Sequence, residues 1–91
     1  MKNVYFGLAD NGYYLNLGGV RDSISNVVLC KTLNEVLDIL SGKGDHHIQE
    51  HRKLELIYDK EIAKEDINFI KQNATKRGIK LERVVLDKRY L

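Results

Sequence analysis

Apolar and polar residues alternate around one glycine-containing turn near the start of the chain. In residues 3–18, NVYFGLADNGYYLNLG, the pair Asn11-Gly12 is typical of a two-residue type I′ turn, which needs positive φ angles. Folding about this turn sets Leu8 opposite Leu15 and predicts a β-hairpin. One of its faces carries the apolar set Val4, Phe6, Leu8, Leu15 and Leu17, and the other carries Tyr5, Gly7, Ala9, Tyr14 and Asn16. A slip of one residue would expose the whole apolar set, so the pattern favours one buried face.

A third strand and a first helix are predicted over residues 27–41. The unbroken run VVLC at residues 27–30 indicates a strand that is covered on both sides. Thr32 and Glu35 have the spacing of a capping box, in which each side chain satisfies a free backbone donor at a helix start. The helical stripe that follows consists of Leu33, Val36, Leu37 and Leu40. Gly42 favours termination, so the helix is predicted from about Thr32 to Ser41.

A fourth strand, a second helix and a fifth strand are predicted in the second half of the chain. Residues 53–59, KLELIYD, alternate as a half-buried strand does. The second helix carries an apolar face made of Ala63, Ile67, Ile70 and Ala74. Gly78 closes this helix, and residues 79–87, IKLERVVLD, form the last strand.

These elements predict an α/β fold, a two-layer sandwich that comprises an N-terminal β-hairpin plus β-α-β-α-β. Helical crossovers would join the third, fourth and fifth strands, and we therefore expect these three to be parallel neighbours. Both helices are expected on one face of a mixed five-stranded sheet. The chain of 91 residues is interpreted as a single domain, residues 1–91.

Composition indicates a folded chain that does not enter a membrane, since 43% of the residues are hydrophobic and 31% are charged. No stretch approaches the roughly 20 apolar residues of a membrane span, and the first residues lack the pattern of a secretory signal. Cys30 is the only cysteine, which fits a reducing compartment and a cytoplasmic location. Richness in Lys, Ile, Asn and Tyr without Pro or Trp is typical of AT-rich coding DNA, and suggests a small accessory protein of a phage or mobile element.

The three histidines lie within residues 44–51, GDHHIQEH, between the first helix and the fourth strand. On a helix, His47 and His51 would be neighbours four positions apart and could bind one metal ion. The order of residues does not match the His-Glu-x-x-His motif of metalloproteases. The segment is first interpreted as a polar connector. The alternatives are a metal site at His47 and His51, or a catalytic or pH-sensing histidine within residues 46–51.

Basic residues are concentrated at the C-terminal end, where residues 71–91 carry seven Lys or Arg against two acidic side chains. The side chains that could contact phosphate groups or another anion are Arg21, Lys76, Arg77, Lys80, Lys88 and Arg89. Arg21 belongs to the loop NLGGVRDS, which lacks the spacing of a known phosphate-binding loop. A solubilising surface explains the same residues, so nucleic-acid binding is kept as an alternative.

The sheet face opposite the helices supplies the leading functional hypothesis. The side chains expected on it are Tyr5, Tyr14, Ile57, Arg83 and Val85, a mixture that resembles protein interfaces in composition. Sheet edges can also pair with a second copy. We therefore predict a small non-enzymatic binding or regulatory module that forms a homodimer or binds another protein, without a cofactor. The alternatives are a nucleic-acid-binding accessory protein and a small metal-dependent enzyme.

Overall fold

The computed structural model describes residues 2–19, 26–43, 48 and 53–89 of the chain. It contains five strands and two helices in the order β-β-β-α-β-α-β, as predicted. The strands are β1 (Lys2–Ala9), β2 (Gly12–Asn16), β3 (Val27–Cys30), β4 (Leu54–Tyr58) and β5 (Leu81–Leu86). The helices are α1 (Leu33–Leu40) and α2 (Lys64–Lys76). The prediction of an α/β fold with a mixed five-stranded sheet is confirmed.

The strands lie in the order β3-β2-β1-β4-β5 across the sheet. β2 is antiparallel to both of its neighbours, whereas β4 is parallel to β1 and to β5. The prediction that the third and fourth strands are neighbours is therefore wrong, since β2 and β1 lie between them. The physical reason is that β3 occupies the outer side of β2, so the free side of β1 is where β4 can join the hairpin. The neighbouring parallel pair of β4 and β5 is confirmed.

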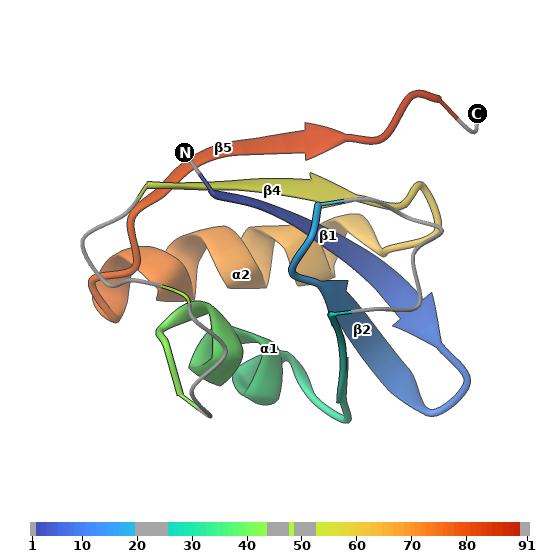
Figure 1. The fold of residues 1–91 in the computed structure, drawn as a ribbon, viewed down its shortest axis with the longest axis horizontal. Helices are drawn as coiled ribbons and strands as arrows, with labels where there is room; N and C mark the ends of the chain where they lie inside the picture. The colour runs from blue at the N-terminus through green and yellow to red at the C-terminus, as the bar shows by residue number, and fades with distance from the viewer. Residues whose placement is uncertain (1, 20–25, 44–47, 49–52, 90–91) are drawn as a thin grey trace.

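Both helices pack against the same face of the sheet, as predicted (Figure 1). Apolar side chains from the strands and from both helices meet there in one core, which includes Phe6, Leu15, Leu37, Leu56 and Ile70. Each of these side chains is fully buried. Burying this apolar surface on one side of each strand is the main source of stability for such a two-layer arrangement.

The hairpin has the predicted faces but a different register. Leu8 lies opposite Tyr13, not Leu15, and the two turn residues are Asp10 and Asn11. Gly12 belongs to β2, where a Cβ atom would lie 2.3 Å from the carbonyl oxygen of Cys30 in β3. Glycine is thus needed for this close approach of two backbones, and the predicted Asn11-Gly12 turn is wrong. Each side chain keeps its face because the pairing differs by an even number of residues.

The helix ends follow the sequence signals closely. The Thr32 hydroxyl accepts a hydrogen bond from the backbone N–H of Glu35 at 3.2 Å, which caps α1. The Glu35 carboxylate in turn accepts a hydrogen bond from the backbone N–H of Lys31. Gly78 follows α2 with a φ of 72°, a conformation that glycine adopts without strain. Ala63 departs from its prediction, because it is the exposed residue before the helix and not part of the buried face.

Among the residues that the structure describes, no helix is both long and apolar enough to cross a membrane.

Candidate protein-interaction surface

One set of strand side chains projects away from the helices, on the side of the sheet that we call the far face. Val4 and Phe6 of β1 enter the core, so Tyr5 between them projects to the far face. Tyr5 is paired with Ile57 and Ile57 with Val85, which forms one row across three strands. The same alternation places Tyr14 and Arg83 there, and all five residues predicted for partner binding thus share one face. Their role in binding stays a prediction.

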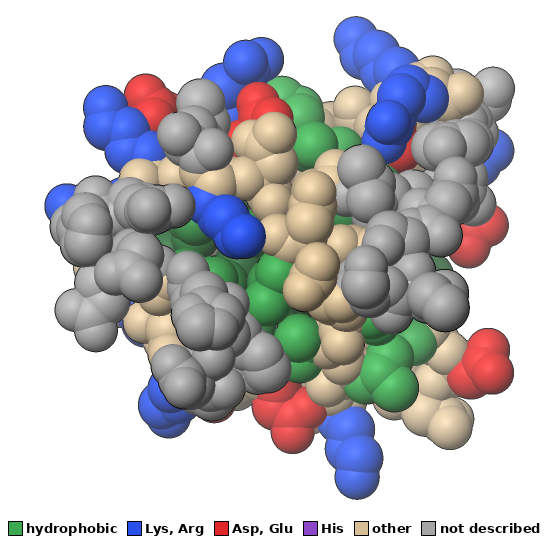
Figure 2. Space-filling model, in the orientation of Figure 1, with side chains coloured by type: hydrophobic (Ala, Val, Ile, Leu, Met, Phe, Trp, Pro, Cys, Tyr) green, Lys and Arg blue, Asp and Glu red, His purple; other side chains and the backbone are tan. Residues whose placement is uncertain are grey.

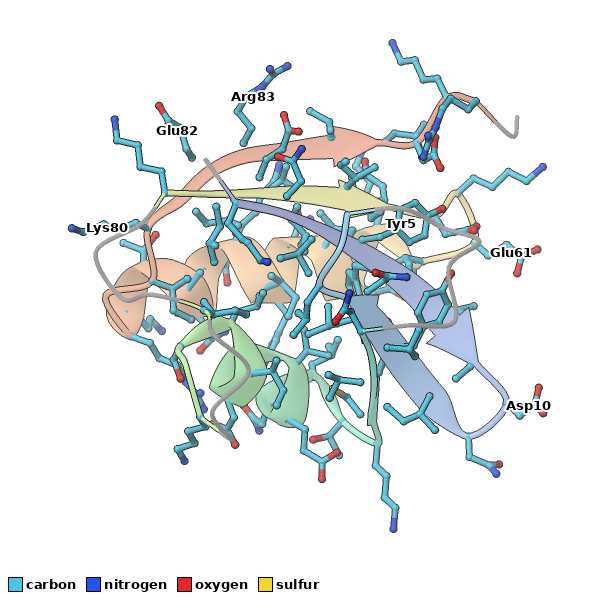
Figure 3. All side chains as sticks on the ribbon, in the orientation of Figure 1. Tyr5, Asp10, Glu61, Lys80, Glu82 and Arg83 are labelled. Carbon is cyan, nitrogen blue, oxygen red and sulfur yellow. The ribbon has the colours of Figure 1, made fainter. Side chains whose placement is uncertain are left out.

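The side chains of the far face are less exposed than a protein-binding surface requires. Tyr5 has no exposed surface, and Tyr14, Ile57 and Val85 are each only partly exposed. Arg83 is exposed and points away from the helices (Figure 3), and its Nη1 lies 3.4 Å from the Glu55 carboxylate. This face therefore presents separate apolar and charged positions, not one apolar plane.

Tyr5 is the centre of a polar network under the far face. Its hydroxyl donates a hydrogen bond to Oδ2 of Asp59 at 3.2 Å. The ring of Tyr14 stacks beside it, with 6.2 Å between the ring centroids. Gly7 makes room for that ring, since a Cβ atom at this position would lie 2.3 Å from Cε1 of Tyr14. Burial, together with the neighbouring carboxylates of Asp59 and Asp87, raises the pKa of Tyr5 well above its ordinary value.

Asp87 forms the second part of this network, directly after β5. Asp87 is only 5% exposed, and its carboxylate accepts hydrogen bonds from the backbone N–H and the Nε of Arg89, both at 3.1 Å. Hydrogen bonding to Arg89 is the main cause that lowers the pKa of Asp87 below its ordinary value. The carboxylate is thus held in its charged form although it is buried. The sequence contained one signal for this network, because Asp59 and Asp87 each follow a parallel strand directly.

The groups of the Tyr5 network are held by hydrogen bonds and an ion pair. A raised pKa keeps the Tyr5 hydroxyl protonated at neutral pH, so it cannot act as a base there. Arg89 neutralises Asp87, and the backbone N–H of Glu61 donates to Oδ1 of Asp59 at 3.0 Å. Within the described part of the chain, no three His, Cys, Asp or Glu side chains gather into a group that could hold a metal ion.

Among the described residues of the sheet, the most exposed large apolar side chain belongs to the edge strand β3. β3 is the last strand on its side, and Leu29 is 74% exposed and Val27 38% exposed. The backbone N–H of Leu17 donates to the carbonyl of Asn26 at 3.0 Å. In an antiparallel pair every second residue of a strand bonds to its neighbour, so this contact and the register identify which residues of β3 bond to β2. With this pattern, Val28 and Cys30 bond to β2, whereas the N–H and C=O groups of Val27 and Leu29 point outward.

Two pockets lie beside this edge and share the residues Leu29 and Cys30. The first has a volume of about 310 Å³ and lies between β3 and the outer side of α1, where Ile39 is part of its wall. The second, of about 400 Å³, lies at the end of β3 beside the hairpin turn, where Tyr13 and Lys31 line it. Each pocket is large enough for at least one apolar side chain of a neighbouring strand.

Cys30 itself is buried, with 4% of its surface exposed. Burial raises the pKa of its thiol to about 11. The thiol is therefore protonated at neutral pH, as expected for a small buried hydrophobic residue.

The five described residues of the set predicted to bind anions do not form one surface. Lys76 and Arg77 lie at the end of α2, and the carbonyl of Lys80 accepts a hydrogen bond from the N–H of Leu54 at the start of β4. Lys88 and Arg89 follow the opposite end of β5, about 20 Å away along the strand. The blue side chains in Figure 2 likewise stand in separate places.

Both arginines of the described basic set are also engaged by carboxylates. Nη1 of Arg77 lies 2.6 Å from Oδ1 of Asp38 in α1, and Arg89 binds Asp87. Hydrogen bonding to Arg77 is also the main cause that lowers the pKa of Asp38. These two arginines are therefore less available to an external anion than the lysines.

Three predicted site residues lie outside the described residues. These are Arg21 of the loop after β2 and the two candidate metal ligands His47 and His51. Anion binding by the first and metal binding by the other two stay predictions.

Comparison of the chain with protein-family models, with curated proteins and with solved structures found no match.

Proposed function

We propose that the chain is a small non-enzymatic protein-binding module whose docking site is the outer edge of β3. The observation that carries this proposal is the exposure of Leu29, 74%, on the last strand of the sheet, where the backbone groups of Val27 and Leu29 point away from β2. Natural edge strands are usually protected by charges, proline or a covering segment. An exposed leucine at such an edge is suited to a contact with another polypeptide.

The binding mode that fits this edge is addition of one strand. An incoming extended segment would accept hydrogen bonds from the N–H groups of Val27 and Leu29 and donate to their carbonyl groups. Its alternate side chains would point toward the pocket between β3 and α1, with Ile39 in the wall. The backbone would supply affinity, and the pocket would select an apolar side chain.

Two features weigh against the alternatives within the described residues. Nucleic-acid binding requires cations that act together on one phosphate backbone, and the basic residues lie at opposite ends of β5. An enzyme requires reactive groups around a cavity, and the Cys30 thiol that both pockets beside β3 share is protonated at neutral pH because burial raises its pKa. We further propose a cytoplasmic location and an accessory role in a phage or mobile element, on the composition alone.

The test uses a displayed library of short random peptides as the probe. We expect selected peptides to have alternating apolar residues and to shift the NMR signals of the Val27 and Leu29 amides. Leu29→Lys should abolish this binding. The matched control is Leu8→Lys, which changes another exposed leucine that lies two strands away in β1. Peptides that bind Leu29→Lys as tightly as the unchanged chain would contradict the proposed docking site.

A further inference from the structure

The edge of β3 is complementary to itself. In an antiparallel pair of two β3 strands, only the outward groups of Val27 and Leu29 can form the connecting hydrogen bonds. The symmetric register that uses both residues sets Val27 of one copy opposite Leu29 of the other. This register forms four hydrogen bonds around a two-fold axis, because each of the two pairs exchanges two bonds.

Alternative symmetric registers use the outward groups less well. If Leu29 lay opposite Leu29 of the second copy, the next bonded pair would join Val27 to Lys31. The N–H of Lys31 already donates to the Glu35 carboxylate at the start of α1. If Val27 lay opposite Val27, the next pair would join Leu29 to residue 25, which precedes β3.

We propose that β3 pairs antiparallel with β3 of a second copy, about a two-fold axis through Val28. The two five-stranded sheets would become one continuous sheet, with all helices on the same side. This inference rests on the proposed function, because it uses the same docking edge and names its occupant.

Side chains and charge both favour a second copy as the occupant. On the far face, Val27 and Leu29 of one copy would each cover the opposite residue of the other copy, so four exposed apolar side chains would leave water. On the helix side, Val28 would meet Val28 next to the pocket that α1 borders. The net charge of each copy is only +2, so repulsion between copies is weak.

Sedimentation of the full chain over a range of concentrations tests the inference. We expect a reversible dimer, and we expect Leu29→Lys to raise its dissociation constant by at least about a hundredfold, since two buried leucines are lost for each dimer. Leu8→Lys is the matched control and should leave the dissociation constant unchanged. A chain that stays monomeric at millimolar concentration, or a Leu29→Lys variant that dimerises normally, would overturn the proposal.

Cysteine crosslinking tests the register in a Cys30→Ala background. Residues that meet at the axis as a pair without hydrogen bonds have Cα atoms about 4.5 Å apart, within the range that a disulfide can span. Val28→Cys should therefore form a covalent dimer on oxidation. Leu29→Cys should not, because its Cα atoms would be separated by two positions along the strands. Crosslinking through Leu29→Cys alone would overturn the register.

These results are distinguishable from failure of the proposed function. If the chain is monomeric but peptides still bind at the edge of β3, the second copy is the wrong occupant and the docking site stands. If neither a second copy nor a peptide binds there, both proposals fail.

Discussion

The hydroxyl of Tyr5 lies 3.2 Å from Oδ2 of Asp59, although 54 positions separate the two residues in the sequence. The parallel pairing of β1 with β4 brings them together, since the N–H of Asp59 also donates to the carbonyl of Phe6. This hydrogen bond therefore depends on the pairing of β1 with β4 at the centre of the sheet. Its removal is the first test of the described fold.

Tyr5→Phe should lower the free energy of unfolding by about 1–3 kcal/mol, because it leaves a carboxylate without its buried donor. Urea denaturation monitored by circular dichroism measures this change. Tyr58→Phe is the matched control, because Tyr58 is half-buried in the neighbouring strand and its hydroxyl makes no hydrogen bond to the described residues. An equal loss for both variants would contradict a specific role of the Tyr5 hydroxyl.

Stability should fall as the pH rises above about 10, the ordinary pKa of tyrosine. The folded chain keeps Tyr5 protonated because burial raises its pKa, whereas the unfolded chain releases that proton above its ordinary pKa. The unfolded state then binds fewer protons, so alkaline pH favours unfolding. Urea denaturation at a series of alkaline pH values measures the slope, which should be smaller in Tyr5→Phe. An identical slope in both chains would be evidence against a buried Tyr5.

Arg89→Gln should make the chain more sensitive to acid. Arg89 lowers the pKa of Asp87, so the folded state keeps this carboxylate charged below the pKa of the unfolded state. The resulting stability is present above the unfolded pKa and is lost as the pH falls through the folded pKa. We expect acid unfolding of Arg89→Gln to occur at a higher pH than that of the unchanged chain. Lys88→Gln removes the adjacent exposed charge and should leave the midpoint unchanged.

Gly7→Ala should destabilise the chain by about 1–3 kcal/mol, because the new methyl group overlaps the ring of Tyr14. The φ angle of Gly7 is not positive, so alanine causes no backbone strain there. In a Tyr14→Ala background the same change should be neutral or stabilise by up to about 1 kcal/mol. Thermal unfolding of the four chains completes this double-mutant cycle. Equal effects of Gly7→Ala in both backgrounds would show that the ring is not the obstacle.

The sequence predicts the local features of this fold better than the contacts between residues that are far apart in the chain. The faces of the hairpin follow from alternation alone, and the start of α1 follows from the spacing of Thr32 and Glu35. The register of the hairpin could not be obtained in this way. Gly12 is required by its approach to Cys30, and that contact exists only after β3 has joined the sheet.

The position of β3 in the sheet, and with it the candidate site, could also not be predicted from the local sequence pattern. An apolar run such as VVLC is typical of a central strand, but here Leu29 lies at an exposed edge. The shortness of β3 and its position before a helix do not distinguish these two cases. The far-face residues, in contrast, were predictable, because strand alternation assigns them once the core residues are known.

The central place of β1 has a consequence for synthesis of the chain. The hairpin of β1 and β2 can close while the chain is still short, but one side of β1 stays without a strand until residues 54–58 have left the ribosome. Contacts between segments so distant in sequence slow folding, because a long loop must close first. During elongation, the nascent chain therefore presents an incomplete sheet, and a chaperone that shields β1 should raise the yield of folded protein.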